Sequence, residues 1–270
     1  MNDQKPVDDS RWDHSSHEQF TQDYAEKSLN ESTLARFTRF YDIAELLLHM
    51  ESKQLQLEVA DIGCGAGTQA TIWAKKGHKA HAIDINEPLV ELAKQRAEAE
   101  KLEIEYLIGS ATELPWQDHS VDVCLVPELL EHVEEWQQVL NECTRIIRPG
   151  GLLILSTDNK LCPVQQEFNL PLYSWYPGFV KRYYERLAVT SRPEIANYAT
   201  YPAVNWFSFF ELESYLGKSR FDSYDRYDLI QLDGRPAWFR TAFTLCKNIW
   251  PLRWLGHVIT PYTMIAAIKK

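Results

Sequence analysis

The chain has few cysteines, and none of them lies in the spacing that binds zinc. Five occur among 270 residues, and no pair forms a Cys-x-x-Cys motif. They are Cys64, Cys124, Cys143, Cys162 and Cys246. Because an odd number leaves one cysteine over, the sequence predicts neither a disulfide framework nor a zinc site. We therefore expect a reducing, cytoplasmic environment.

Long apolar runs are also missing. No stretch of about 18 uninterrupted apolar residues is present, so no segment is predicted to span a bilayer. Residues 1–17 are polar and acidic, without the apolar centre of a signal peptide, and we expect a polar arm. The formal charge of −10 argues against a nucleic-acid partner, because affinity for phosphate backbones comes largely from clustered Lys and Arg.

Acidic residues are absent from one end of the chain. After Asp233 the sequence has no Asp or Glu but six basic residues, so the last 37 residues carry +6 and the preceding 233 carry −16. The six are Arg235, Arg240, Lys247, Arg253, Lys269 and Lys270. This asymmetry calls for a functional or structural reason.

Residues 235–257 are basic and rich in tryptophan. On the interpretation that residues 237–259 form one helix, its polar and apolar residues fall on different faces. The first face holds Arg240, Thr244 and Lys247, and the second holds Trp238, Ala242, Leu245 and Ile249. Such a segment is typical of helices that lie in an anionic membrane surface. The alternative is an ordinary helix packed on the domain with its charges in water.

Strand and helix patterns alternate through the middle of the chain. The sequence predicts strands over residues 57–63, 79–84, 104–109, 120–127 and 150–157, and helices over 68–77, 88–101 and 134–147. Strands that alternate with crossover helices indicate a parallel sheet with helices on both faces. We therefore predict an α/β, Rossmann-like, doubly wound and mostly parallel sheet.

Four regions are expected around this pattern. Residues 1–54 form the arm and a helical cap, because apolar residues recur at helical spacing up to Met50. Residues 55–159 form the core. Residues 160–220 form an insertion and a helix, and the aromatic and proline-rich part of the insertion, 160–207, is predicted to cover the carboxyl edge of the sheet, where ligands bind. Residues 221–270 contain the C-terminal strands and the basic segment, with a strand expected near residue 224 and a closing strand at the end.

The aromatic residues of the insertion have two interpretations. They either fill a core or line a substrate site, and core packing is the commoner role. They include Tyr173, Trp175, Tyr176, Trp206 and Phe207.

A glycine-rich loop follows the first predicted strand. Residues 61–67 read Asp-Ile-Gly-Cys-Gly-Ala-Gly, and the third glycine of a dinucleotide fingerprint would fall at position 68, which is Thr68. A loop of this kind taken alone is also compatible with an ordinary tight turn. The full order, however, resembles the first motif of the class I S-adenosylmethionine-dependent methyltransferases, and the resemblance extends over about residues 55–160.

This resemblance implies a cofactor and the residues that bind it. The cofactor is S-adenosylmethionine, with S-adenosylhomocysteine as the product. Asp84, at the end of the second strand, is implied to accept hydrogen bonds from the ribose hydroxyls. Ser110 stands where the family commonly has an acid that contacts adenine. The full implied set is Asp61, Gly63, Cys64, Gly65, Gly67, Asp84, Ile85, Ser110, Ala111, Thr112 and Pro127.

Three candidate catalytic residues follow the fourth strand: Glu128, Glu131 and His132. An imidazole with a pKa near 6.5 suits removal of a proton from a hydroxyl acceptor, and Glu131 is the alternative base. Both side chains are also compatible with capping a helix or holding the cofactor loop. A further alternative is that the cluster holds Mg²⁺, which prefers carboxylate oxygens.

Two short segments, 128–133 and 156–159, resemble the ubiquinone-biosynthesis O-methyltransferases, although the resemblance does not continue through the insertion. It implies O-methylation of a small hydroxylated acceptor, quinone-precursor-like and lipid-attached if the basic segment binds the inner face of the membrane. Methylation of a soluble saccharide or other metabolite, and cofactor binding without catalysis, stay open as alternatives. The sequence does not determine the oligomeric state.

Overall fold

The computed structural model describes residues 24–50, 56–165, 167–196, 203, 205–232 and 234–270. The predicted polar arm, residues 1–17, lies outside the described residues.

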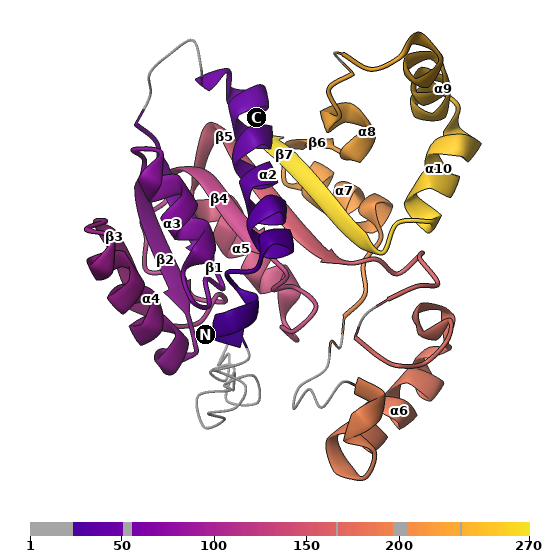
Figure 1. The fold of residues 1–270 in the computed structure, drawn as a ribbon, viewed down its shortest axis with the longest axis horizontal. Coiled ribbons are helices and arrows are strands. Elements are labelled where there is room, and N and C mark those ends of the chain that lie inside the picture. Colours follow the sequence, from indigo (N-terminus) through magenta and orange to yellow (C-terminus); the bar gives the residue numbers. More distant parts are fainter. Residues whose placement is uncertain (1–23, 51–55, 166, 197–202, 204, 233) are drawn as a thin grey trace, which may run out of the picture.

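A seven-stranded sheet runs through the molecule in the order β3-β2-β1-β4-β5-β7-β6 (Figure 1). The strands are β1 (Glu58–Ile62), β2 (Lys79–Asp84), β3 (Ile104–Ile108), β4 (Val121–Pro127), β5 (Ile147–Asp158), β6 (Phe221–Tyr224) and β7 (Tyr262–Lys269). Neighbouring strands among the first five pair in parallel, whereas β7 pairs antiparallel with both β5 and β6. The predicted Rossmann-like, mostly parallel sheet is confirmed.

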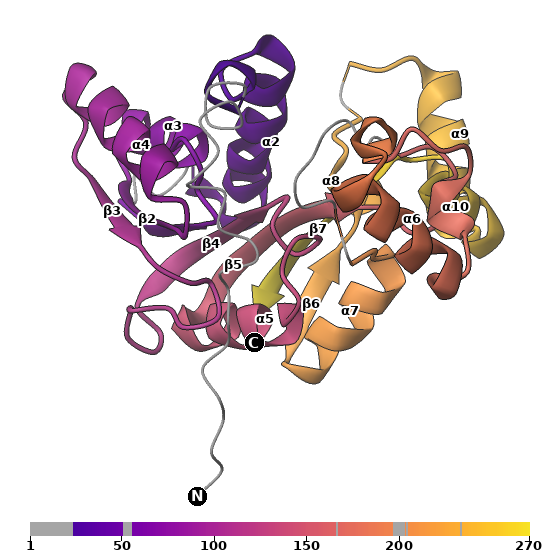
Figure 2. The same cartoon turned by 90° about the horizontal axis from the view of Figure 1, so that it is seen from below.

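Helices cover both faces of the sheet (Figure 2). One face carries α2 (Glu31–Leu48), α3 (Thr68–Lys75) and α4 (Glu87–Ala99), and the other carries α5 (Trp136–Ile146) and α7 (Phe209–Lys218). Strand β1 shows why, because its side chains alternate between the faces. Val59 belongs to the cluster with Trp73 of α3, while Ala60 belongs to the cluster with Leu140 of α5. Burial on both faces requires the nearly continuous apolar strands of this sequence.

Local sequence signals set the helix starts near the site. The side chain of Asn86 accepts a hydrogen bond from the Leu89 N–H at 3.1 Å, and Pro88 lies in the first turn of α4. A reciprocal capping box of Ser208 and Glu211 begins α7. These caps position each helix directly after the strand or loop that precedes it.

The insertion has a small core of its own. It contains η3 (Tyr173–Trp175), α6 (Gly178–Thr190) and η4 (Pro193–Ala196). The rings of Phe168 and Tyr173 stack with centroids 4.0 Å apart. Tyr176 and Trp206 pack against this cluster, Phe207 joins the main core, and Trp175 is 55% exposed. The core interpretation of these aromatics is therefore confirmed for all of them except Trp175.

The C-terminal region contains the two expected strands, β6 near residue 224 and β7 at the end. Between them lie α8 (Arg226–Leu229), α9 (Ala237–Asn248) and α10 (Trp250–Val258). Strand β6 ends at Tyr224, because Asp225 caps α8 by accepting from the Tyr227 N–H at 2.7 Å. The interpretation of residues 237–259 as one helix is wrong. The helix is interrupted at Ile249, which lies between α9 and α10. Pro251, which has no N–H to donate, lies in the first turn of α10.

Candidate cofactor and acceptor site

A cavity of about 900 Å³ lies at the carboxyl ends of the parallel strands. Segments that follow five different strands line it: residues 63–65, 84–86, 109–111, 127–133 and 156–158. The carboxyl ends of parallel strands meet at one edge, and a crevice opens there where the strand order reverses between β1 and β4. Residues far apart in the sequence are thereby brought to one site.

The glycine loop requires its glycines at two positions beside the cavity. Gly63 and Gly65 have φ angles of 72° and 50°, in the left-handed region that favours glycine. A Cβ at Gly65 would lie 2.5 Å from the Tyr24 hydroxyl. The backbone of the loop can therefore approach a ligand closely, as the sequence predicts.

Asp84 holds the loop in place. Its Oδ2 accepts a hydrogen bond from the Gly65 N–H at 2.7 Å, and its Oδ1 accepts from the Asn86 N–H at 2.8 Å. A carboxylate has about four acceptor sites, so ribose hydroxyls can still bind to the same side chain. Asp84 thus has a structural role in addition to the one implied by the resemblance.

Asp61 presents an unsatisfied oxygen to the cavity. The side chain is 1% exposed, its Oδ2 accepts from the Ala70 N–H at 3.1 Å, and its Oδ1 has no hydrogen-bond partner among the described residues. Burial, together with the nearby charge of Asp84, raises the pKa of Asp61 to about 7. A buried carboxyl oxygen of this kind calls for a partner, and a cationic donor is the strongest one available. The site therefore fits the ammonium group of S-adenosylmethionine.

This arrangement predicts a pH-dependent affinity for the cofactor. A cation beside Asp61 stabilises the carboxylate, so binding below about pH 7 must release a proton. The affinity should rise with pH, by up to about tenfold per unit, and level off above pH 7 to 8. Calorimetry in two buffers of different ionisation enthalpy measures the released proton directly. Asp61→Asn should abolish this pH dependence, and an affinity independent of pH between 5.5 and 7 in the wild type would contradict the assignment.

The other residues of the predicted cofactor set divide into two groups. Cys64, Ile85, Ser110, Ala111 and Pro127 line the cavity. Gly67 and Thr112 are not among the lining residues.

Gly67 and Thr112 instead contact residues next to the cavity. Gly67 is the left-handed N-cap of α3, where a Cβ would lie 2.8 Å from that of Ala93. The Thr112 hydroxyl lies 2.7 Å from that of Ser110. Direct contact of the cofactor with Gly67 or Thr112 stays an untested prediction.

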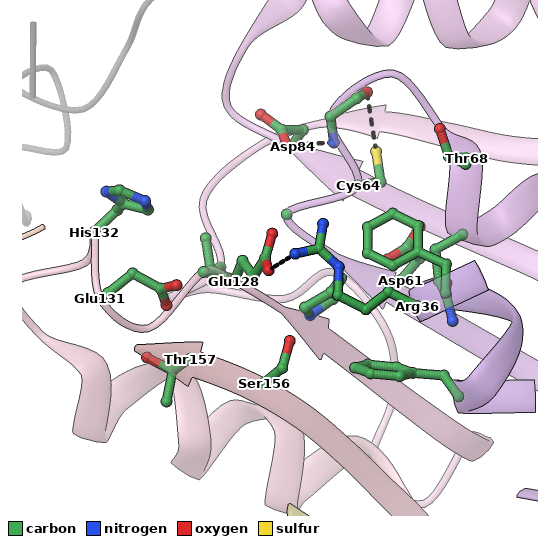
Figure 3. A pocket seen from close by; sticks show the side chains of 18 of the residues that line it. Arg36, Asp61, Cys64, Thr68, Asp84, Glu128, Glu131, His132, Ser156 and Thr157 are labelled. Carbon is green, nitrogen blue, oxygen red and sulfur yellow. Dashed lines mark hydrogen bonds and ion pairs between the residues drawn. The ribbon is translucent and has the colours of Figure 1, made fainter. Parts of the chain in front are cut away.

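The three candidate catalytic residues lie on the loop after β4, and their environments differ (Figure 3). Glu128 forms an ion pair with Arg36 of α2. Burial, followed by the neighbouring charge of Asp158, raises the pKa of Glu131 well above its ordinary value. Burial lowers the pKa of His132 to about 4. The raised pKa disfavours the carboxylate form of Glu131 that a base requires, while the imidazole of His132 is neutral at neutral pH and able to accept a proton, which favours His132 as the base.

The Mg²⁺ alternative finds no support in the part of the chain that the structure describes. No group of three or more His, Cys, Asp or Glu side chains is arranged there to hold a metal ion. Arg36 already pairs with Glu128, and burial raises the pKa of Glu131, which disfavours the carboxylate form that a metal ion requires.

Several lining residues were not predicted, and four of them carry polar or charged groups beside the candidate catalytic residues or the glycine loop. Arg36 and Tyr24 come from the N-terminal region, and Asp158 and Glu167 come from the end of β5 and from the insertion. Burial and nearby carboxyls raise the pKa of Asp158 to about 8. Sequence signals existed for two of them. Arg36 lies four residues before buried Phe40 and so shares its helix face, and Asp158 lies in the segment 156–159 that carries part of the resemblance.

The comparison with known proteins agrees with this site. Residues 60–155 match the family model described as "Methyltransferase domain". The core of this chain is thus similar to a methyltransferase domain. The match covers the strands and loops from β1 to β5 that build the cavity, and the resemblance to the class I S-adenosylmethionine-dependent methyltransferases is confirmed.

Curated relatives match over the same region. A ubiquinone biosynthesis O-methyltransferase from Coxiella burnetii is 36% identical over 102 residues, which cover 38% of this chain and 44% of the relative. A malonyl-[acyl-carrier protein] O-methyltransferase from Serratia marcescens is 30% identical over 116 residues, which cover 43% of this chain and 44% of the relative. The chain thus spans less than half the length of these relatives.

Solved structures share the fold over most of the chain. The PH0226 protein from Pyrococcus horikoshii has a TM-score of 0.54 at 17% identity, covering 90% of this chain and 93% of that chain. A SAM-dependent methyltransferase from Methanosarcina mazei has a TM-score of 0.52 at 20% identity, covering 82% and 97%. At these identities the likeness establishes the fold.

Proposed function

We propose that this protein transfers the methyl group of S-adenosylmethionine to a hydroxyl oxygen of a small acceptor. The observation that carries the proposal is that a partly buried, neutral imidazole, that of His132, lines the same cavity as the glycine loop and Asp84. Alignment of donor and acceptor provides much of the acceleration in a displacement of this type, and a base removes the remaining proton. A cavity of about 900 Å³ has room for a cofactor and an acceptor together.

Different residues of the cavity would bind the cofactor and remove the proton. Asp84 would bind the ribose hydroxyls and Asp61 the ammonium group, which orients the cofactor along the glycine loop. When bound, the cofactor supplies a methyl group whose bond to sulfur breaks, with its electron pair left on sulfur, as the acceptor oxygen bonds to that carbon. His132 Nδ1 or Nε2 takes the hydroxyl proton.

Two carboxyl groups with raised pKa values, Glu131 and Asp158, line the cavity on the side that we propose for the acceptor. With a pKa of about 8, Asp158 holds a proton at neutral pH and can donate a hydrogen bond to an acceptor oxygen. Asn205 keeps this side in place, since its side-chain amide donates to the carbonyls of Leu130 and Val133 at 3.1 and 2.6 Å. Because residue 205 closes the insertion, this contact supports the idea that the insertion borders the acceptor site.

The acceptor we propose is a phenol or catechol of the quinone-precursor type, attached to a lipid. The support is the name of the Coxiella relative, together with the exposed apolar C-terminal helices described below. Both relatives are named O-methyltransferases, which favours oxygen as the methylated atom. A soluble hydroxylated metabolite is the competing acceptor class.

The test is an untargeted methylation experiment. A cell extract is incubated with the protein and isotopically labelled S-adenosylmethionine, extracted into organic and aqueous phases, and analysed by mass spectrometry. We expect a labelled methyl ether in the organic phase that is absent with Asp84→Ala. A labelled product only in the aqueous phase would replace the lipid-attached acceptor by a soluble one. Labelled nitrogen or carbon products would overturn O-methylation.

A further inference from the structure

Helices α9 and α10 present an exposed apolar surface that nothing in the described structure covers. They lie together on the outside of the molecule, at the right in Figure 1. No residue of α9 is buried. Trp238, Trp250 and Ile259 are exposed by 72%, 67% and 71%. The surface, here called the α9–α10 surface, comprises Trp238, Leu245, Ile249, Trp250, Leu252, Trp254, Leu255 and Ile259.

Exposed apolar side chains are normal singly, but a group of this size on two adjacent helices marks an interaction site. Tryptophan is enriched where one side of a surface is apolar and the other is wet, as at a membrane interface. The α9–α10 surface holds three tryptophans. No described helix is long and apolar enough to cross a membrane, so an interaction with lipid would take place at the surface of the bilayer.

Ion pairs engage several of the basic residues that follow Asp233. Arg253 donates to Asp225 and Asp228 at 2.7 Å each, and Lys247 lies 3.2 Å from Asp228. Near the C-terminus, Lys270 pairs with Asp222 at 2.8 Å, and Lys269 donates to backbone carbonyls. These four charges are engaged within the protein.

Arg235 and Arg240 have a different environment. Both are exposed, and neither forms an ion pair with any residue that the structure describes. The Arg235 guanidinium lies 5.8 Å from the centroid of the Phe239 ring. Both flank Trp238 in the sequence, and no acid follows in the chain. The available positive charge of this region is therefore concentrated at the start of α9, beside an exposed tryptophan.

A buried network holds the α9–α10 surface rigidly on the domain. Asp225 is 0% exposed, and its Oδ2 lies 2.8 Å from His257 Nε2 of α10. Asn159, which follows β5, donates to the carbonyls of His257 and Thr260 at 2.7 Å each. The next residue along the chain, Pro261, lines the cavity. The surface and the cavity are thus joined by a short, fixed segment.

From this geometry we infer that the protein docks on anionic lipid bilayers through the α9–α10 surface. Trp238, Trp250 and their apolar neighbours enter the headgroup region, while Arg235 and Arg240 bind lipid phosphates. The occupant is a lipid surface because the available charges are positive and the exposed aromatics are those of interfacial helices. The net charge of −10 opposes the attraction, so the binding is weak, reversible and restricted to this orientation.

The test is co-sedimentation with vesicles of phosphatidylcholine, alone or mixed with phosphatidylglycerol. We expect the wild type to sediment with the mixed vesicles at low salt and to be released at high salt, because exposed charges are screened beyond about 8–10 Å at physiological ionic strength. Arg235→Glu with Arg240→Glu should weaken binding at least about tenfold, since each basic residue near an anionic surface strengthens binding about fivefold. Trp238→Ser with Trp250→Ser should weaken it similarly. Lys247 and Arg253 are left intact because their ion pairs with Asp225 and Asp228 hold α9 and α10 in place.

A matched control uses exposed aromatics elsewhere. Trp175→Ser with Phe179→Ser, at η3 and α6, should leave binding unchanged. Circular dichroism and the affinity for S-adenosylhomocysteine should be the same in every variant as in the wild type. These two measurements confirm that each variant is folded. Absence of wild-type sedimentation, or equal loss in the control variant, would overturn the proposal. So would a self-associated wild type that Trp238→Ser with Trp250→Ser converts to monomers, since a second copy would then be the occupant. Because no turnover is measured, this result is independent of the proposed function.

Discussion

Replacement of His132 by alanine is expected to lower the rate of methyl transfer about 10²–10⁴-fold while leaving cofactor affinity nearly unchanged. The loss would follow because a hydroxyl acceptor must give up its proton, and we propose the neutral imidazole of His132 as the base. Its pKa of about 4 means that the imidazole is unprotonated at every pH above about 5. The wild-type rate should therefore not fall near pH 6.5, as it would with an ordinary histidine, but only as the pH approaches 4.

The measurement is a single-turnover rate with the acceptor identified by isotope labelling, combined with calorimetry of S-adenosylhomocysteine. His81→Ala is a suitable control, since His81 lies on β2 between Glu58 and Glu105 and is not among the residues that line the cavity. It should leave both quantities unchanged. If His132→Ala lowers cofactor affinity as much as turnover, the residue supports the loop, which is the alternative that the sequence left open.

Replacement of Asp84 by alanine should lower the affinity for S-adenosylmethionine about 10²-fold or more. Two hydrogen bonds from the Gly65 and Asn86 N–H groups, at 2.7 and 2.8 Å, end on this carboxylate. Hydrogen bonds to charged groups contribute about 1.5–3 kcal/mol each, and 1.4 kcal/mol is about tenfold in affinity. The variant loses the bonds that hold the loop as well as the acceptors for the ribose hydroxyls.

Asp84→Asn separates these roles. Its amide keeps one acceptor oxygen, so the loss of affinity should lie between those of the alanine variant and the wild type. Asp222→Ala, which removes a surface ion pair with Lys270, is the matched control and should have no effect on affinity. Calorimetry with S-adenosylmethionine and with NADH completes the test. Unchanged affinity in Asp84→Ala, or tight binding of NADH by the wild type, would contradict the assigned cofactor site.

The sequence by itself was sufficient for the sheet and for the glycine loop. Alternating strand and helix patterns are local, and a buried parallel strand such as 121–127 carries its own apolar signature. The glycines of the loop indicate positive φ angles, because glycine adopts that backbone conformation more readily than other residues. Asp61 and Asp84 came from the resemblance to the class I S-adenosylmethionine-dependent methyltransferases, and the paired strands β1 and β2 bring both to the cavity.

Only the tertiary structure decided the electrostatics. Whether Glu131 or His132 is the base depends on burial, which raises the pKa of one and lowers that of the other, and burial is a property of the assembled fold. The partner of Glu128 is Arg36, which lies 92 positions away in the sequence. In the C-terminal region the sequence shows six basic residues, but only the fold shows that Arg253 binds Asp225 while Arg235 and Arg240 stay exposed. The reason is physical: a local pattern specifies backbone conformation, whereas the energy of a charge depends on every group that the folded chain brings near it.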